Sequence, residues 1–120
     1  YEIARHLLDC GYRRLGYVAT TEAHEAREKR ARLRSKGFYK ALRDAGLPPP
    51  PRISVPDPLN IEESGFIAAD FVTSHSTVEA ILCANEIIGA GALAELQRRG
   101  RRVPDEIAVA GIGDANIAAL

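Results

Sequence analysis

The sequence predicts an α/β fold, in which a parallel sheet is flanked by helices on both faces. Short apolar runs alternate with longer segments whose apolar residues recur every three or four positions, and glycine or proline closes most of these segments. Apolar strands that alternate with helices indicate βαβ units and a parallel sheet covered on both sides. The length of 120 residues fits one domain with a single core.

Each element follows from the local pattern, taken in chain order. Helices are expected over residues 3–9, 28–45, 61–73 and 86–99, and strands over 15–19, 52–55, 80–83 and 107–110. Gly11 is expected to stop the first helix, and the polar stretch from Thr20 to about Ala26 is expected to be a loop. The core-facing residues expected on the second and third helices, from their helical spacing, are Phe38, Ala41, Leu42, Ala45, Phe66, Ala69 and Val72.

Charge and reactive side chains argue against several classes of protein. Sixteen basic residues balance sixteen acidic ones, whereas a domain that binds the phosphate backbone by itself is usually strongly basic. The segment is therefore expected to bind DNA poorly on its own. Its cysteines and histidines are scattered, at Cys10, Cys83, His6, His24 and His75. Their spacing matches no metal, redox or catalytic site, so no metal, cofactor or enzymatic activity is expected. No apolar run approaches the roughly 20 residues of a membrane span.

The most informative polar residue is Arg34. In open parallel sheets ligands bind outside the carboxyl ends of the strands, here the loops after Ala19, Val55, Cys83 and Ala110. Arg34 projects from the apolar stripe of its helix near this edge. A partly buried guanidinium needs a polar or anionic partner. Arg34 is therefore either structural, as an internal ion-pair partner of Asp or Glu or as a packed aliphatic stem with its head in water, or a clamp for a ligand carboxylate or vicinal hydroxyls.

Three further residues each have a structural and a ligand-binding interpretation. Asn85 precedes a helix and either caps its first turn or hydrogen-bonds a ligand, and both roles are compatible if the backbone provides the cap. Asn60 either caps the helix that begins at Ile61 or faces the crevice. Asp114 follows the last strand in a Gly-rich connection that is typical of a turn. The glycines there are too few and too scattered for a dinucleotide fingerprint or a P-loop.

A basic run accompanies the second helix. Its members are Arg27, Lys29, Arg30, Arg32, Arg34, Lys36 and Lys40. The run is either a nucleic-acid patch or the solvated face of a helix. Glu25 and Glu28 interrupt it, and most members fall on the side opposite the apolar stripe, which favours a solvated face.

The order of the segments resembles that of the LacI/GalR repressors across the whole chain. Residues 6–17 (HLLDCGYRRLGY) resemble the family's HL…GHRRIGY stretch, with Tyr12 in place of the usual His. Residues 34–42 (RSKGFYKAL) and 45–47 (AGL) match RxxGFxxAL followed by AGL. Residues 84–86 (ANE) resemble AND, and residues 90–111 match GAL…G…VPxDIAVxG. Each motif alone is weak, but all of them in this order at matching distances are specific.

The resemblance implies a periplasmic-binding-protein type I fold, with two lobes and a small-molecule effector held between them. Residues 1–120 would form a single partial domain, most of the C-terminal lobe. The DNA-binding helix-turn-helix and the N-terminal lobe would lie upstream, outside this fragment. The resemblance also implies a cytoplasmic homodimer, with the helix over 86–99 as a candidate interface. The effector-binding residues that it implies are Arg34, Asn85, Asp114 and Asn60.

One departure from the family bears on the effector. The family usually has two acidic residues after the last strand, the first of which contacts the ligand, but Gly113 occupies that position and only Asp114 remains. A missing carboxylate disfavours a neutral sugar and removes repulsion against an anion. Residues 83–86, 96–100 and 110–114 most resemble the gluconate-repressor branch, so the expected effector is a sugar or, more specifically, a sugar acid.

Two rival functions remain at the level of the sequence. A secreted periplasmic sugar-binding protein of a transporter shares the fold, although the sequence VPDEIAVAG of residues 103–111 favours a regulator. An enzyme on a doubly wound sheet is the third interpretation. It lacks both a nucleotide fingerprint and a catalytic constellation.

Overall fold

The computed structural model describes residues 1–56, 58–112 and 117–119, the last three by their backbone alone. The helices are α1 (Glu2–Asp9), α2 (Glu22–Arg27), α3 (Lys29–Asp44), α4 (Ile61–Ser74) and α5 (Glu86–Arg98). The strands are β1 (Leu15–Ala19), β2 (Arg52–Ser54), β3 (Ala80–Cys83), β4 (Ala108–Ile112) and β5 (Ile117–Ala119).

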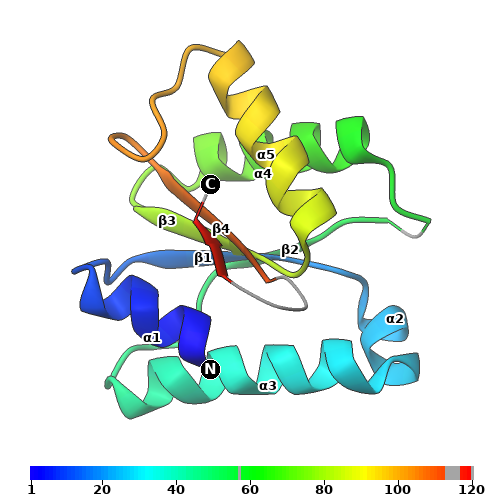
Figure 1. Ribbon diagram of the computed structural model, residues 1–120, viewed down its shortest axis with the longest axis vertical. Helices are drawn as coiled ribbons and strands as arrows, with labels where there is room; N and C mark the ends of the chain where they lie inside the picture. Colours follow the sequence, from blue (N-terminus) through cyan, green and yellow to red (C-terminus); the bar gives the residue numbers. More distant parts are fainter. Residues whose placement is uncertain (57, 113–116, 120) are drawn as a thin grey trace.

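The strands form one sheet in the order β2-β1-β3-β4-β5. The first four are parallel, with Val18 of β1 opposite both Ile53 and Cys83, and β5 pairs antiparallel with β4. Figure 1 shows α1 and α3 on one side of the sheet and α4 and α5 on the other. The predicted fold class, a parallel α/β sheet covered on both faces, is confirmed. The antiparallel β5 was not among the expected elements.

The core is continuous through the sheet. Every residue of β1 and β3 is buried, as expected for strands covered on both faces. On the α3 side, the ring of Phe38 meets that of Tyr17 edge to face at 5.0 Å. Burial raises the pKa of Tyr17 to about 12, so its hydroxyl stays protonated. On the other side, α4 and α5 cross closely, because a Cβ on Gly91 would collide with the carbonyl oxygen of Ile61, and one on Gly65 with that of Gly91.

Three expectations about local structure are wrong. The stretch expected as a loop contains α2, a six-residue helix capped by Thr21 that buries none of its residues. Because it has no apolar stripe, periodicity gives no signal for it. Phe66 was expected in the core but is 48% exposed. α4 packs against the sheet and against α5, and Phe66 lies at the border of the α4–α5 contact, where the guanidinium groups of Arg98 and Arg99 lie 5.7 and 5.5 Å from the centre of its ring. Ala45 is exposed as well, since the helix already ends at Asp44.

Candidate functional site: the carboxyl edge of the sheet

The strand order contains one topological switch point, between β1 and β3. From β1 the chain moves outward to β2, and from β2 it returns past β1 to β3 and then β4. The two connections therefore leave the carboxyl ends of β1 and β3 toward opposite faces, and in open parallel sheets this is the edge where a ligand crevice is expected. The segments that line the crevice from these two strands start at Thr20 and Ala84. The amide of Ala84 still donates to the carbonyl of Val18 at 2.9 Å, so the two strand ends are held together up to the crevice.

Asn85 lies at this switch point, after the end of β3, and caps α5 with its side chain. Its Oδ1 accepts a hydrogen bond from the amide of Ile88 at 2.9 Å. The capping interpretation is confirmed, and the cap comes from the side chain rather than from the backbone. The side-chain nitrogen of Asn85 makes no hydrogen bond within the described part of the chain. Asn85 therefore offers a ligand its amide donor, while its oxygen has already given one of its two lone pairs to the helix cap.

Asn60 has the same structural role on α4. Its Oδ1 accepts from the amide of Glu63 at 2.9 Å, and its side chain is exposed. It follows the outer strand β2, so one strand, β1, separates its position from that of Asn85 in the sheet. The structure confirms the cap and leaves any contact of Asn60 with a ligand as a prediction.

Arg34 lies in the second turn of α3 and is half-buried. α3 is the helix that leaves the carboxyl end of β1 through α2, so its first turns are the ones nearest to the strand ends. Asp114 lies outside the residues that the structure describes. Arg34 lies in an early turn of α3 and Asn85 directly before α5, so both belong to segments that follow the strands at the switch point. Their contact with a ligand stays a prediction.

The helices add electrostatic character to this edge. α4 and α5 both begin at it, and the amino terminus of a helix carries a partial positive charge with free amide groups. An anionic or hydroxyl-rich ligand is favoured at such positions. Glu62, Glu63 and Glu86 in the first turns offset part of this field.

Sequence reasoning missed the polar residues that fix the β1–α3 connection. Glu25 of α2 pairs with Arg52 of β2, with 2.8 Å between Oε1 and Nη2. Arg52 also donates to the carbonyl oxygen of Thr20 at 3.1 Å, directly after β1. Thr21 as a helix cap followed by Glu22 was the available sequence signal for α2.

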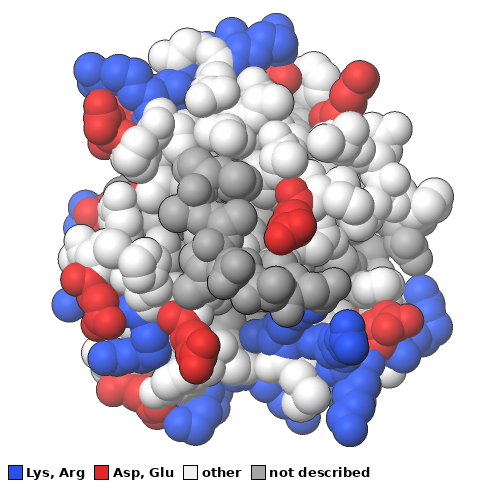
Figure 2. All heavy atoms as spheres, viewed as in Figure 1, with Lys and Arg blue, Asp and Glu red and all other residues white. Residues whose placement is uncertain are grey.

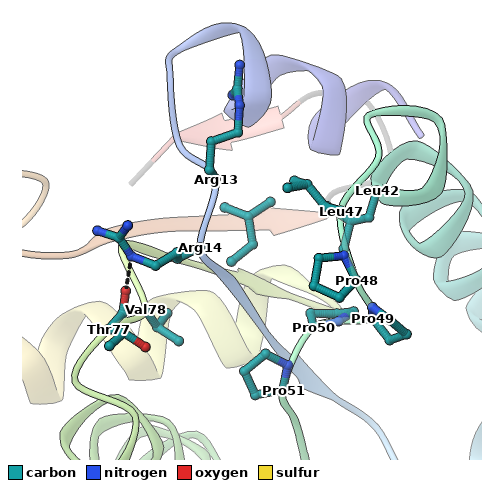
Figure 3. Close-up of a pocket in the computed structure, with 11 residues that line it drawn as sticks. Arg13, Arg14, Leu42, Leu47, Pro48, Pro49, Pro50, Pro51, Thr77 and Val78 are labelled. Carbon is teal, nitrogen blue, oxygen red and sulfur yellow. Dashed lines mark hydrogen bonds between the residues drawn. The ribbon is translucent and has the colours of Figure 1, made fainter.

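A hollow of about 300 Å³ lies at the opposite, amino-terminal edge of the sheet. Leucines, valine and the prolines 48–51 line it (Figure 3). The guanidinium groups of Arg13 and Arg14 at its border point away from the prolines, toward the carbonyl oxygens of Leu8 and Thr77 respectively. This apolar hollow therefore does not suit a hydroxylated or acidic ligand.

Most of the basic run faces solvent, as predicted, whereas Arg32 and Arg34 are half-buried. Lys29, Lys36 and Lys40 are exposed, and Lys40 forms an ion pair with Asp44 at 2.8 Å. Figure 2 shows acidic side chains interspersed with the basic ones along the lower edge, where α3 runs in Figure 1. The mixture of charges is typical of a solvated helix face.

Two further findings concern the described residues only. No three histidine, cysteine, aspartate or glutamate side chains come together there in a way that would hold a metal ion. None of the helices is both long and apolar enough to cross a membrane.

A parallel α/β lobe with polar residues at a topological switch point is typical of ligand-binding domains. The chain belongs to the periplasmic-binding-protein-like domain family, whose sequence model matches residues 4–120. It is 36% identical over 112 residues to the HTH-type transcriptional regulator GntR of Pseudomonas aeruginosa, covering 92% of this chain and 31% of that protein. It is 27% identical over 114 residues to the HTH-type transcriptional repressor PurR of Haemophilus influenzae, covering 95% and 33%.

Solved structures give the same picture. The regulator GntR from Chromobacterium violaceum superposes with a TM-score of 0.79 at 28% identity, covering 92% of this chain and 39% of that one. A LacI family regulator from Silicibacter pomeroyi gives 0.75 at 26% identity, with coverages of 95% and 42%. The resemblance to LacI/GalR regulators is confirmed, and the two GntR proteins support the gluconate-repressor branch. These relatives are transcriptional regulators rather than enzymes. The chain spans about a third of the length of the curated relatives.

Proposed function

We propose that the chain is most of the C-terminal lobe of the effector-binding region of a LacI/GalR-type transcriptional regulator. In the whole protein, an N-terminal lobe would close the crevice and a helix-turn-helix headpiece would read DNA. A small sugar or sugar acid bound between the lobes shifts their relative orientation and thereby changes how the headpieces meet DNA. The size of this effect is limited by the difference in affinity of the effector for the two states. The protein acts in the cytoplasm and catalyses no reaction.

The observation that carries this proposal is the switch point, where Arg34 and Asn85 reach one edge from different elements. The similarity to GntR and PurR over nearly the whole chain supports a regulator. The comparisons give no support to the alternative, a secreted periplasmic sugar-binding protein of a transporter.

A sugar acid is the proposed effector class. Arg34 offers a guanidinium to a carboxylate, Asn85 offers an amide donor, and the amino termini of α4 and α5 add partial positive charge. Asn60 and Asp114 are proposed as further effector contacts. About half of the contacts would come from the other lobe, so the isolated 120 residues should bind effector only weakly.

A thermal-shift screen of sugars, sugar acids and sugar phosphates against the complete two-lobed protein tests the proposal. We expect gluconate to raise the melting temperature of the wild type and to have little effect on Arg34→Ala, because the clamp for its carboxylate is lost. Binding of a ligand at 100 times its Kd adds about 2.7 kcal/mol of stability, which is several degrees in melting temperature.

Lys36→Ala is the matched control, since Lys36 is an exposed cation on the same helix. It should retain the full shift with gluconate. A neutral sugar whose shift survives Arg34→Ala would overturn the sugar-acid proposal while leaving the family intact. Turnover of any compound in the screen would contradict the proposal that the protein is not an enzyme.

We further propose that the protein is a homodimer in which α5 contributes to the interface, together with α4. The two helices border a hollow of about 380 Å³ lined by residues that include Ile61, Phe66 and Ala94. Ile61, Phe66 and Ile87 are 49%, 48% and 50% exposed. Large apolar side chains gathered on one face favour contact with a second copy of the chain.

A further inference from the structure

Helix α2 lies directly after the carboxyl end of β1 but contributes nothing to the core. None of its residues is buried, so apolar packing does not hold it in place. The hydroxyl of Thr21 caps its first turn by accepting from the amide of His24 at 3.1 Å. Nη1 of Arg32 donates to the carbonyl of Ala26 at 3.2 Å, which ties its last turn to α3. Its contact with the sheet is made by Glu25.

The carboxylate of Glu25 accepts hydrogen bonds from two layers of the fold. Arg52 of β2 donates to Oε1 at 2.8 Å, and Ser35 of α3 donates to the same oxygen at 2.8 Å. Tyr17 of β1 lies 2.6 Å from the hydroxyl of Ser35, and the hydroxyl of Tyr39 accepts from Arg52 at 3.3 Å. The side chains of Glu25 and Arg52 are only 15% and 20% exposed. These five residues are the Glu25 cluster.

The directions of the hydrogen bonds make the charge of Glu25 central to this cluster. An ionised carboxylate only accepts hydrogen bonds. Ser35 therefore gives its one hydroxyl proton to Glu25, and Tyr17 in turn must donate to Ser35. Arg52 has donors only. A neutral amide at position 25 would keep an acceptor oxygen but would lose the charge that strengthens both bonds.

Two buried polar atoms, on Arg52 and on the residue whose backbone it contacts, are left without a partner in the described part of the chain. They are Oγ1 of Thr20 and Nε of Arg52. Thr20 is 7% exposed. Buried atoms without hydrogen bonds lower stability, and a buried ion pair adds little net stability compared with apolar packing. The cluster is therefore better explained by a need to fix the position of α2 than by a need for stability.

We infer that Glu25 is a positioning residue of the effector site, whose carboxylate fixes α2 and the Thr20–Thr21 loop as a wall beside the β1–β3 switch point. This inference rests on the proposed function. The same carboxylate holds Ser35, the neighbour of Arg34, so it also sets where the first turns of α3 lie relative to the strand ends. Glu25 acts through the backbone of Thr20 and through Arg34, not through contact with the effector.

Hydrogen–deuterium exchange on the complete two-lobed protein, without ligand, is the first test. Glu25→Gln is expected to speed the exchange of amides in residues 22–28 by at least about tenfold, because α2 loses its charged tether, while β1 and β3 keep their protection. Glu22→Gln, an exposed residue of the same helix, should exchange as the wild type does. Glu25→Asp, which restores the charge on a shorter stem, should recover part of the protection.

Gluconate affinity of the same proteins, measured by calorimetry, is the second test. Glu25→Gln should weaken binding about tenfold or more while the melting temperature changes little, and Glu25→Asp should recover part of the affinity. If Glu25→Gln unfolds the protein, Ser35→Ala removes one hydrogen bond of the cluster and should show the same order of effects.

The exchange and calorimetry experiments together distinguish a failure of this inference from a failure of the proposed effector class. Unchanged exchange of α2 in Glu25→Gln would overturn the inference, whatever gluconate does. Faster exchange with unchanged gluconate affinity would also overturn it, since α2 would then be no wall of the site. A wild type that binds no sugar acid would refute the proposed effector class, and the exchange data would still decide whether Glu25 positions α2.

Discussion

Glu95 is a buried acid on α5 whose charge is held by two arginines. Its carboxylate accepts from Arg98 and Arg99, and Arg99 continues to Asp70 of α4 at 2.8 Å. The side chain of Glu95 is 9% exposed, whereas that of Arg98 is 64% exposed. Hydrogen bonds from Arg98 and then Arg99 lower the pKa of Glu95 to about 2. The charge is therefore retained far into the acid range.

This lowered pKa predicts a specific acid sensitivity. The unfolded chain binds the proton more tightly than the folded state, so the stabilisation by Glu95 is present above its usual pKa of 4.5 and is lost as the pH falls toward 2. The free energy of unfolding should therefore fall more steeply between pH 5 and 3 in the wild type than in Glu95→Gln. Urea denaturation at a series of pH values measures this slope.

Glu62→Gln controls for the loss of one negative charge. Glu62 is exposed and, like Glu95, lines the hollow between α4 and α5. Equal slopes for the wild type and Glu95→Gln would show that the arginines do not stabilise the carboxylate. Other acids with a lowered pKa, such as Glu79 and Glu106, contribute to both proteins and cancel in the comparison.

Individual residues were predictable where one local rule decides their role. Asn60 and Asn85 precede apolar helical segments, and both cap the helix that follows. The exposure of Phe66 was not predictable, because helical spacing shows which residues share a face but not whether the fold covers that face. Glu25 and Arg52 are 27 positions apart and meet only through the tertiary fold, so no local pattern identifies them as a pair.

At the scale of elements, α4 and α5 cross at a short distance. Gly65 and Gly91 face each other where a Cβ on either would collide with a backbone oxygen of the other helix. Backbone atoms cannot move aside as a flexible side chain can. The two glycines therefore set the distance between the helices.

Gly91→Ala is expected to destabilise the protein by about 1–3 kcal/mol, as overpacking does. Helix propensity alone would make this substitution stabilising, because alanine is the better helix former by about 1 kcal/mol. A loss of stability would therefore come from the collision between the helices. Chemical denaturation measures the change. Ala90→Gly, at an exposed position of α5, measures the helix-propensity effect by itself. A variant Gly91→Ala as stable as the wild type would show that the helices can separate at little cost.

The elements with an apolar pattern were predictable to within one or two residues. The strands 15–19 and 80–83 coincide with β1 and β3, since a continuous apolar run between turn residues has few alternatives. α2 was missed because a short polar helix is held by its cap and by Glu25 rather than by burial. β5 was missed because it pairs antiparallel at the edge of the sheet, outside the βαβ pattern.

At the scale of the whole molecule, the proposed homodimer predicts an asymmetry between the two helical layers. Phe66→Asp, on the α4–α5 side, should raise the dimer dissociation constant at least tenfold, or about 1.4 kcal/mol, because a charge would be buried in an apolar contact. Sedimentation of the complete protein at several concentrations measures this constant.

Leu33→Asp is the control, since Leu33 is 52% exposed on α3 in the opposite layer. It should leave the dissociation constant unchanged. If both variants dimerise as the wild type does, the α4–α5 face is not the interface. If only Leu33→Asp dissociates, the interface lies on the α3 side.

The short outer strand β2 also bears on how these molecules behave when concentrated. An open sheet edge offers free backbone groups to which another chain can add as a further strand. Here that edge is three residues long and framed by Pro51 and Pro56, neither of which has an amide proton to donate. The proline-rich turn before β2 thus protects the lobe against edge-to-edge aggregation.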